Sequence, residues 1–150
     1  MTKVSKYTKK SASRLAAVQS MYEINMVEAS SKAAVDDYLE FFEGDKISEH
    51  EDISLNAEFY KKLVKETHDR CADINEMIDE ALPENIIPKR LDILARSVLQ
   101  VAIAELLSEV ETDAAVIINE YVDVTHAFYS GKEHKLVNGI LNTLSKKIRY

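Results

Sequence analysis

The amino-acid sequence predicts an all-α protein, and three features of its composition lead to that prediction. Hydrophobic residues make up 46% of the 150 residues, but aromatic residues make up only 7% and tryptophan is absent. Alanine, leucine, isoleucine and valine therefore carry most of the apolar content, which suits the packing of helix on helix. With only three glycines and two prolines, tight turns must be few, which argues against all-β and doubly wound folds.

Apolar residues spaced three and four apart predict the helices of the first half. A first helix is expected over 13–27 and a second over about 30–44. A third apolar stripe follows over 54–78, as one long helix or as two, and Ser54 can cap its start.

Both prolines, Pro83 and Pro88, fall within six positions of each other. Each disfavours helix in the residue before it, so the segment 83–90 is predicted to be a linker between two small helical bundles. The expected parts of the chain are a basic flexible arm at 1–10, an N-terminal helical bundle at 11–82, the linker at 83–90 and a C-terminal helical bundle at 91–150.

The second half predicts three more helices, which brings the expected total to about six or seven. The stretch 91–107 is apolar on nearly every side, and a helix of that kind lies in the middle of a bundle. Another helix is expected to start at Thr112 or Asp113 and to reach Phe128. Gly131 interrupts the chain before a last helix that carries Val137 on its apolar face.

The sequence offers little for catalysis, and we expect no enzyme, no cofactor and no metal site. The glycines are scattered rather than clustered in a phosphate-binding loop, and the four histidines lack metal-ligand spacing. Glu105 and Glu120 could form an acid–base pair, but helix capping or hydrogen bonds between helices are the favoured interpretation. The longest apolar run, 114–118, is far shorter than the roughly 20 residues of a membrane span. A cytoplasmic protein with a lone, unpaired Cys71 is therefore expected.

The charge is distributed unevenly along the chain. The formal net charge is −7, yet the first 20 residues hold five basic residues and no acidic one, and the last 20 hold five basic residues and one acidic one. Local potential rather than net charge attracts phosphate. If the fold brings the two ends together, they form a basic patch on an acidic body.

Aromatic and basic side chains are interleaved before the last helix, at Phe128, Tyr129, Lys132, His134 and Lys135. Aromatic rings stack on unpaired bases, and lysines neutralise phosphates. This pattern favours single-stranded RNA as a partner. The alternative is that the charges are simply solvated and that Phe128 belongs to the core.

Four segments of the chain are informative when they are taken together: RLAAVQSMY at 14–22, LQVAIAELL at 99–107, VIINEYVDVTHAF at 116–128 and HKLVNGIL at 134–141. In residues and in order, they resemble segments of the NusB family of bacterial transcription antitermination factors. The resemblance implies two packed helical bundles of the NusB type. It also implies a heterodimer with NusE, a small-subunit ribosomal protein, and binding to boxA RNA within the transcription elongation complex. Asn119 and Glu120 are expected to bond between helices, and Gly139 to allow a close helix approach.

The resemblance also implies roles for single residues. Lys10 and Arg14 match cationic positions, Tyr22 matches a tyrosine of the first helix, and Phe128 and Leu136 match apolar contacts to RNA. The expected RNA-binding residues are Lys6, Lys9, Lys10, Arg14, Tyr22, Phe128, Lys132, His134, Lys135 and Leu136, and the expected partner-binding residues are Tyr22 and Glu105.

The chain departs from the family's pattern at five positions, which are Ser11, Ala12, Gln100, His126 and Lys132. Arginines or other basic residues are frequent at the first four, and an acid is common at the last. These departures concern the strength and register of RNA contact rather than the fold. The expected function is an RNA-binding antitermination factor without covalent chemistry, and the alternative is a helical adaptor that binds proteins alone.

Overall fold

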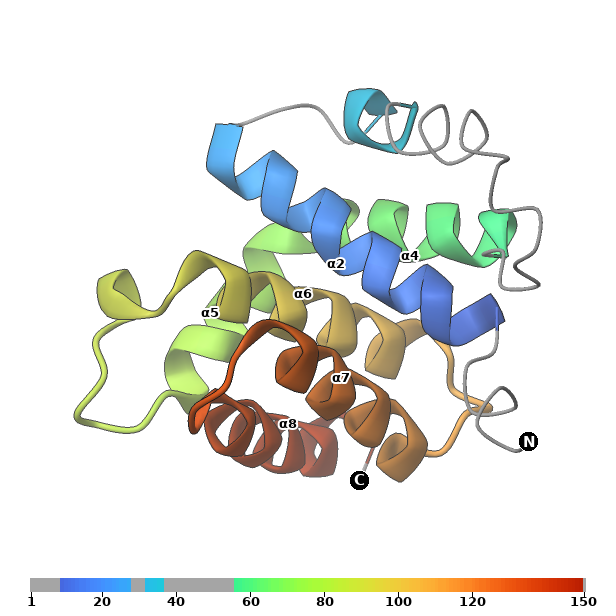
Figure 1. Ribbon diagram of the computed structural model, residues 1–150. Helices are drawn as coiled ribbons and strands as arrows, with labels where there is room; N and C mark the ends of the chain where they lie inside the picture. Colours follow the sequence, from blue (N-terminus) through green and yellow to red (C-terminus); the bar gives the residue numbers. More distant parts are fainter. Residues whose placement is uncertain (1–8, 28–31, 37–55, 150) are drawn as a thin grey trace.

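The computed structural model describes residues 9–27, 32–36 and 56–149, and it is helical with no strand over those residues (Figure 1). Residues 32–36 are helical, and they are all that is described of the helix expected over 30–44. The other elements are α2 (Lys9–Val27), α4 (Ala57–Asp69), α5 (Cys71–Ala81), the short 3-10 helix η2 (Pro88–Arg90), α6 (Ile93–Ser108), α7 (Ala114–Phe128) and α8 (Glu133–Arg149). The prediction of an all-α fold is confirmed.

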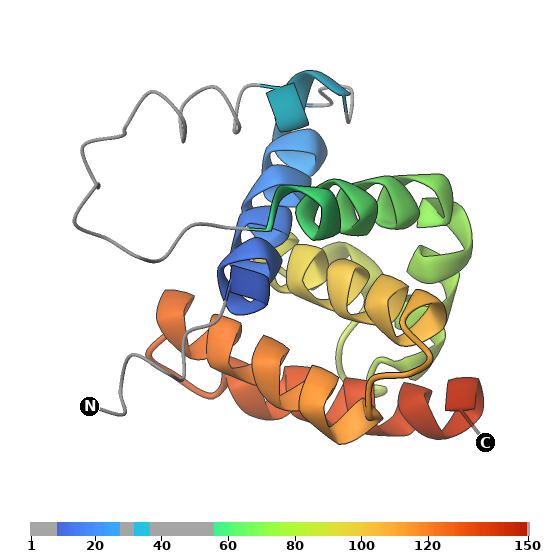
Figure 2. The same ribbon diagram turned by 90° about the vertical axis from the view of Figure 1, so that its right-hand side faces the viewer.

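Helix α6 is the centre of the molecule. Figure 2 shows it between α2 and α4 on one side and α7 and α8 on the other, and α5 also packs on it. Eleven of its 16 residues are buried, as predicted for a helix that is apolar on nearly every side. Asp92 caps its start, because the side chain accepts a hydrogen bond from the backbone N–H of Ala95. The two halves of the chain thus share one continuous core.

Helix α2 begins earlier than the sequence predicted. It starts at Lys9, so the last two residues of the expected flexible arm are helical, while residues 1–8 lie outside the described part. Ala16 and Ala17 are fully buried, and the Ser20 hydroxyl lies 2.6 Å from the Tyr60 hydroxyl of α4. Small side chains on α2 therefore let it pack closely on its neighbours.

The third apolar stripe forms two helices, which settles the alternative left open by the sequence. Asn56 caps α4 by accepting a hydrogen bond from the backbone N–H of Phe59, and Arg70 separates α4 from α5. Ser54, expected as the cap, lies outside the described residues. Between α5 and α6, the segment 83–90 contains only η2 and holds both prolines.

Helices α7 and α8 run antiparallel and close the fold. Val137 is fully buried on α8, and Arg149 at the end of α8 donates to the backbone carbonyls of Leu106, Glu109 and Thr112. Gly139 faces solvent, and a Cβ atom built there would have nothing within 4 Å. The expectation that Gly139 allows a close helix approach is therefore wrong. None of the described helices has the length and hydrophobicity that a membrane span requires.

Candidate nucleic-acid interface

The turn between α7 and α8 gathers most of the aromatic and basic residues that the sequence singled out. Helix α7 ends at Phe128, the chain is extended at Tyr129, and α8 begins at Glu133. Lys132 and Lys135 are both exposed. We call this end of the α7–α8 hairpin, residues 126–136, the hairpin edge. It presents cationic side chains beside flat ones, which is what an unpaired nucleic acid requires.

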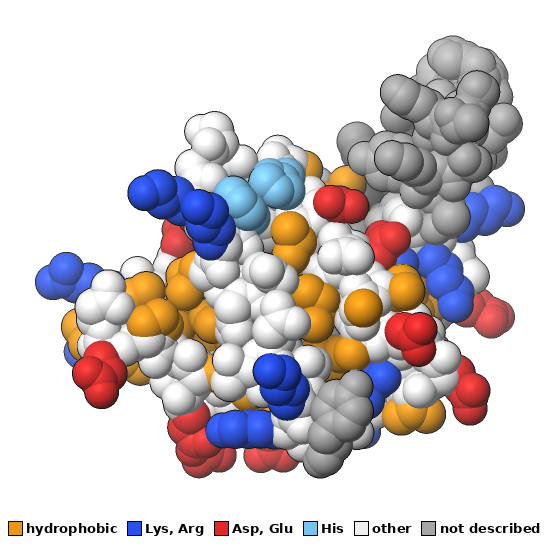
Figure 3. Space-filling view, turned by 90° about the horizontal axis from the view of Figure 1, so that it is seen from below, with side chains coloured by type: hydrophobic (Ala, Val, Ile, Leu, Met, Phe, Trp, Pro, Cys, Tyr) orange, Lys and Arg blue, Asp and Glu red, His pale blue; other side chains and the backbone are white. Residues whose placement is uncertain are grey.

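Two histidines stack on each other at the hairpin edge. The ring centroids of His126 and His134 are 4.3 Å apart, and the ring planes are tilted by 30°. Figure 3 shows the two imidazoles side by side, with lysine or arginine side chains directly next to them. His134 was an expected RNA contact, whereas His126 was noted only as a departure from the family. Their eight-residue spacing across Gly131 was the available signal for the pairing.

The apolar residues of the hairpin edge are anchored rather than free. Phe128, Tyr129 and Leu136 are partly buried and pack against the core. The Tyr129 hydroxyl donates a hydrogen bond to Asp92, and burial, together with that carboxylate, raises the pKa of Tyr129 above its ordinary value of 10.0. Tyr129 thus remains a neutral ring at physiological pH. Anchored rings lose little conformational entropy when a base stacks on them.

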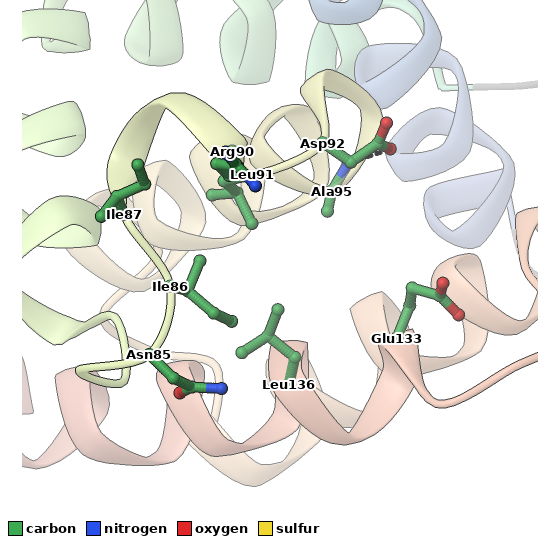
Figure 4. Close-up of a pocket in the computed structure, with 9 residues that line it drawn as sticks. All are labelled: Asn85, Ile86, Ile87, Arg90, Leu91, Asp92, Ala95, Glu133 and Leu136. Atoms are coloured by element: carbon green, nitrogen blue, oxygen red, sulfur yellow. Dashed lines mark hydrogen bonds between the residues drawn. The ribbon is translucent and has the colours of Figure 1, made fainter.

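A cavity of about 340 Å³ lies beneath the hairpin edge, between the linker and the first turns of α6 and α8. Figure 4 shows Ile86 of the linker and Leu136 of α8 pointing toward each other across it. The lining residues are Asn85, Ile86, Ile87, Arg90, Leu91, Asp92, Ala95, Glu133 and Leu136. The side chain of Leu136, which was expected to contact RNA, therefore lines this cavity.

A groove of about 440 Å³ connects the first half of α2 to α7. It is lined by Ser11, Leu15, Glu120, Asp123, Val124, His126 and Ala127. At one end the Ser11 hydroxyl donates to Glu120 over 3.0 Å, and at the other lies His126 of the hairpin edge. The start of α2 and the hairpin edge therefore belong to one surface.

Arg14 is in the interior, and the expectation that it contacts RNA needs correction. Only 5% of the residue is exposed. Its guanidinium donates to both carboxylate oxygens of Glu105, with Nε–Oε1 2.9 Å and Nη2–Oε2 2.8 Å, and lies 3.3 Å from Glu120. Burial works to lower the pKa of Arg14, but hydrogen bonding to and attraction by Glu105 outweigh it and raise that pKa. Two carboxylates thus make burial of this charge tolerable.

Glu105 is also internal, and it cannot be a direct partner contact as expected. Its side chain is fully buried and accepts a hydrogen bond from the Tyr121 hydroxyl at 2.7 Å as well as those from Arg14. Glu120 bonds Ser11 and Arg14 of α2, while Asn119 is exposed. The interpretation of Glu105 and Glu120 as interhelical hydrogen-bond acceptors is confirmed. The bond expected from Asn119 is not found among the described contacts.

Comparison with known proteins decides the family. The family model for NusB matches residues 11–146 of the chain. The protein belongs to the NusB family. The transcription antitermination protein NusB of Bartonella tribocorum is 30% identical over 141 residues, which cover 94% of this chain and 90% of that protein. The protein of the same name from Brucella anthropi is 32% identical, covering 94% and 84%.

Solved structures show the NusB fold. T. maritima NusB superposes with a TM-score of 0.76 at 21% identity, covering 91% of this chain and 90% of that one. A crystal structure of the antitermination factors NusB and NusE in complex with dsRNA gives a TM-score of 0.72 at 22% identity, covering 91% and 96%. Both the all-α prediction and the resemblance to the NusB family are thereby confirmed.

The remaining expected site residues of this NusB-family protein lie on α2 or beyond the described part. Lys9 and Lys10 are exposed in its first turn, with the Lys10 ammonium 5.0 Å from the centroid of the Phe59 ring. Tyr22 is 37% exposed and Met26, one turn later, is 50% exposed, so the second half of α2 presents an apolar surface. Lys6 lies outside the described residues.

Gln100, expected above to be a departure from the family's pattern, is part of the core. It is 1% exposed, accepts a hydrogen bond from Asn25 of α2 and donates one to Asn75 of α5. A neutral amide can both donate and accept, so it suits this buried position between three helices. The departure at Gln100 therefore concerns helix packing.

Proposed function

We propose that the protein is a transcription antitermination factor that binds boxA-type single-stranded RNA at the hairpin edge and the start of α2. The observation that carries the proposal is the hairpin edge itself. On a chain with a formal net charge of −7, exposed Lys132 and Lys135 share the hairpin edge with two stacked histidines and the partly buried Phe128. Lysines neutralise phosphates, and aromatic faces stack on bases.

The groove between α2 and α7 supports a continuous path for RNA from the hairpin edge toward Lys9 and Lys10. Its hydrophobic wall includes Leu15 and Val124. Of its two acidic side chains, Glu120 is held by Arg14 and Ser11, and Asp123 is exposed to solvent. Pairing with Arg14 and Ser11 reduces the repulsion that the Glu120 carboxylate would exert on a phosphate. The first turn of α2 then supplies cations at the far end of the path.

A second part of the proposal is that NusE is the protein partner, within the transcription elongation complex. The related NusB structure in complex with NusE and dsRNA motivates this choice. Tyr22, Met26 and Val27 are exposed on α2 and offer an apolar contact area. The acidic middle of the chain suits a basic ribosomal protein, because complementary charge speeds association. The protein acts by joining its partners and performs no covalent chemistry.

The test is fluorescence anisotropy of a labelled single-stranded boxA RNA, with NusE present, across a salt series. Lys132→Gln with Lys135→Gln should weaken binding and flatten the log–log salt dependence by about 0.7 for each phosphate that is no longer neutralised. The matched control is Lys146→Gln with Lys147→Gln, which removes two exposed lysines from the other end of α8. Equal effects of the two double variants would overturn the hairpin edge as the site.

A helical adaptor that binds proteins alone is the second candidate. The apolar surface of Tyr22, Met26 and Val27 favours it, because that surface needs no nucleic acid to be useful. A complex with NusE that forms fully while single-stranded and double-stranded RNA both fail to bind at low salt would establish this second function instead.

A further inference from the structure

We propose that His126 and His134, with Lys132 and Lys135, form a binding site for one backbone phosphate of RNA, and that the histidine pair takes up a proton when the phosphate binds. This inference rests on the proposed RNA-binding function. It adds His126 as a binding residue, a backbone phosphate as the bound group, and the uptake of a proton on binding. The histidines come from the last turn of α7 and the first turn of α8, so the fold rather than the local sequence brings them together.

The contact between the rings is the first step of the argument. Their centroids are 4.3 Å apart, and His126 is exposed while His134 is partly exposed. A histidine side chain gains or loses its proton between about pH 5 and pH 8. Two imidazolium ions in contact would repel each other, so a proton on one ring opposes a proton on the other.

Several charged groups lie near the two histidines. On the hairpin edge, Lys132 and Lys135 carry positive charge and Glu133 carries negative charge, and Asp123 lies one turn before His126 on α7. The free N–H groups at the start of α8 add positive potential near His134. The pair is therefore surrounded by charges of both signs, from two lysines, two carboxylates and the start of a helix.

The elements packed against the hairpin edge add little charge. Across the groove, α2 presents the uncharged side chains of Ser11 and Leu15, and its Arg14 is bound to Glu105 and Glu120. At the start of α6, the carboxylate of Asp92 accepts a hydrogen bond from the Tyr129 hydroxyl.

A phosphodiester brings negative charge to the two histidines. Its single negative charge, held by Lys132 and Lys135 at the surface, would attract a proton to the adjacent imidazoles and relieve their mutual repulsion. The protonated ring in turn donates a hydrogen bond to a phosphate oxygen. Binding and protonation therefore favour each other, and this coupling makes RNA affinity higher at lower pH.

The experiment measures the dissociation constant of the full chain for a single-stranded boxA RNA at fixed salt between about pH 6 and pH 8.5. The dissociation constant is expected to rise with pH, by at most about tenfold per pH unit for one linked proton. His126→Gln and His134→Gln keep side chains of similar size and polarity but cannot take up the proton. Each should flatten this pH dependence.

Two control variants separate the histidine pair from general effects. His68→Gln changes an exposed histidine on α4 and should keep the wild-type pH dependence. Lys135→Gln should lower affinity at every pH, because it removes a cation that neutralises the phosphate. Calorimetry in two buffers of different ionisation heat should show uptake of a fraction of a proton per RNA in the wild type and less in the His126→Gln and His134→Gln variants.

RNA binding without proton uptake, or an identical pH dependence in the wild type and both pair variants, would overturn this inference and leave the proposed function standing. Absence of RNA binding at every pH, with or without NusE, would overturn both. A pH dependence lost in His126→Gln and His134→Gln but kept in His68→Gln would establish the proton-linked phosphate site.

Discussion

Arg14 and Glu105 form a buried, two-pronged ion pair that joins α2 to α6. Nε and Nη2 of the guanidinium donate to the two carboxylate oxygens over 2.9 and 2.8 Å, and the side chains are 6% and 0% exposed. The Tyr121 hydroxyl of α7 donates to the same carboxylate. Helix α2, which is distant in the sequence, therefore meets α6 and α7 at one carboxylate, and the surface between α2 and α7 depends on this junction.

Removing one partner of this pair should destabilise the protein severely. Arg14→Met leaves the carboxylate of Glu105 buried without its counterion, and breaking a buried pair costs about 3–5 kcal/mol. A native domain has only about 5–15 kcal/mol of stability in total. Urea unfolding followed by circular dichroism measures the loss. The control is Lys62→Gln, which breaks the more exposed Lys62–Glu109 pair and should cost less than about 1 kcal/mol.

The double variant Arg14→Met with Glu105→Leu should lose less stability than the two single changes added together, because it leaves no unpaired charge. Strict additivity would show that Arg14 and Glu105 are not coupled as their geometry requires.

The Tyr121 hydroxyl should make stability fall at alkaline pH. Burial, followed by the charge and the hydrogen bond of Glu105, raises the pKa of Tyr121 well above its ordinary 10.0. Above pH 10 the unfolded chain loses this proton while the folded chain keeps it, so its contribution is complete below pH 10 and declines as pH rises further. Between about pH 9 and pH 11, on either side of the ordinary tyrosine pKa of 10.0, Tyr121→Phe should therefore lose less stability than the wild type.

Thermal melting across that pH range provides the measurement. Tyr22→Phe, which changes an exposed tyrosine on α2, is the matched control and should follow the wild type. Parallel pH profiles for the wild type and Tyr121→Phe would contradict the assignment of the alkaline loss to Tyr121.

A buried charge on α6 or α8 should unfold the protein. Leu99 and Val137 are fully buried in the core, and Leu99→Asp or Val137→Asp places an unpaired carboxylate there at a cost of several kcal/mol. Circular dichroism should show loss of helix in both variants. Val116→Asp is the matched control on α7, since Val116 is 46% exposed and its replacement should leave the melting temperature nearly unchanged. Native melting of Val137→Asp would show that the core face of α8 is misassigned.

Periodicity predicted the core faces well because burial depends on which side of a helix a residue occupies. The apolar stretch 91–107 identified α6 as the central helix, and Val137 was correctly placed on a buried face. Gly139 was misread, since a glycine on an exposed face resembles one at a close helix crossing in the sequence. Helix packing, rather than local pattern, distinguishes the two cases.

Charged site residues were harder to predict, because burial of a charge depends on a partner far away in the sequence. Arg14 continues a basic run and resembles Lys9 and Lys10, yet Glu105, 91 residues later, holds it inside. The histidine pair was missed for a different reason: His126 and His134 are only eight residues apart, but they lie on different helices and meet because the turn between them reverses the chain. The aromatic and basic turn was found because its residues are neighbours in the sequence.

The apolar surface on the second half of α2 should carry the contact with NusE. Tyr22 is 37% exposed, and between it and Met26 the Asn25 amide is bound to Ser97 and Gln100, which fixes the orientation of α2. Tyr22→Asp places a charge on this apolar surface, at a side chain that is not part of the buried core. The isolated variant should therefore melt like the wild type but lose affinity for NusE by about tenfold or more, as for an aromatic residue central to an interface.

Analytical ultracentrifugation of each variant mixed with NusE at micromolar concentration measures this effect. The wild type and Val116→Asp, which adds the same charge at an exposed position of α7, should both sediment as one-to-one complexes, and Tyr22→Asp should not. Association should also be faster at low salt, because the acidic body of this chain attracts a basic partner. A Tyr22→Asp variant that binds NusE as tightly as the wild type would move the contact to another face. Separate sedimentation of wild type and NusE would refute the partnership.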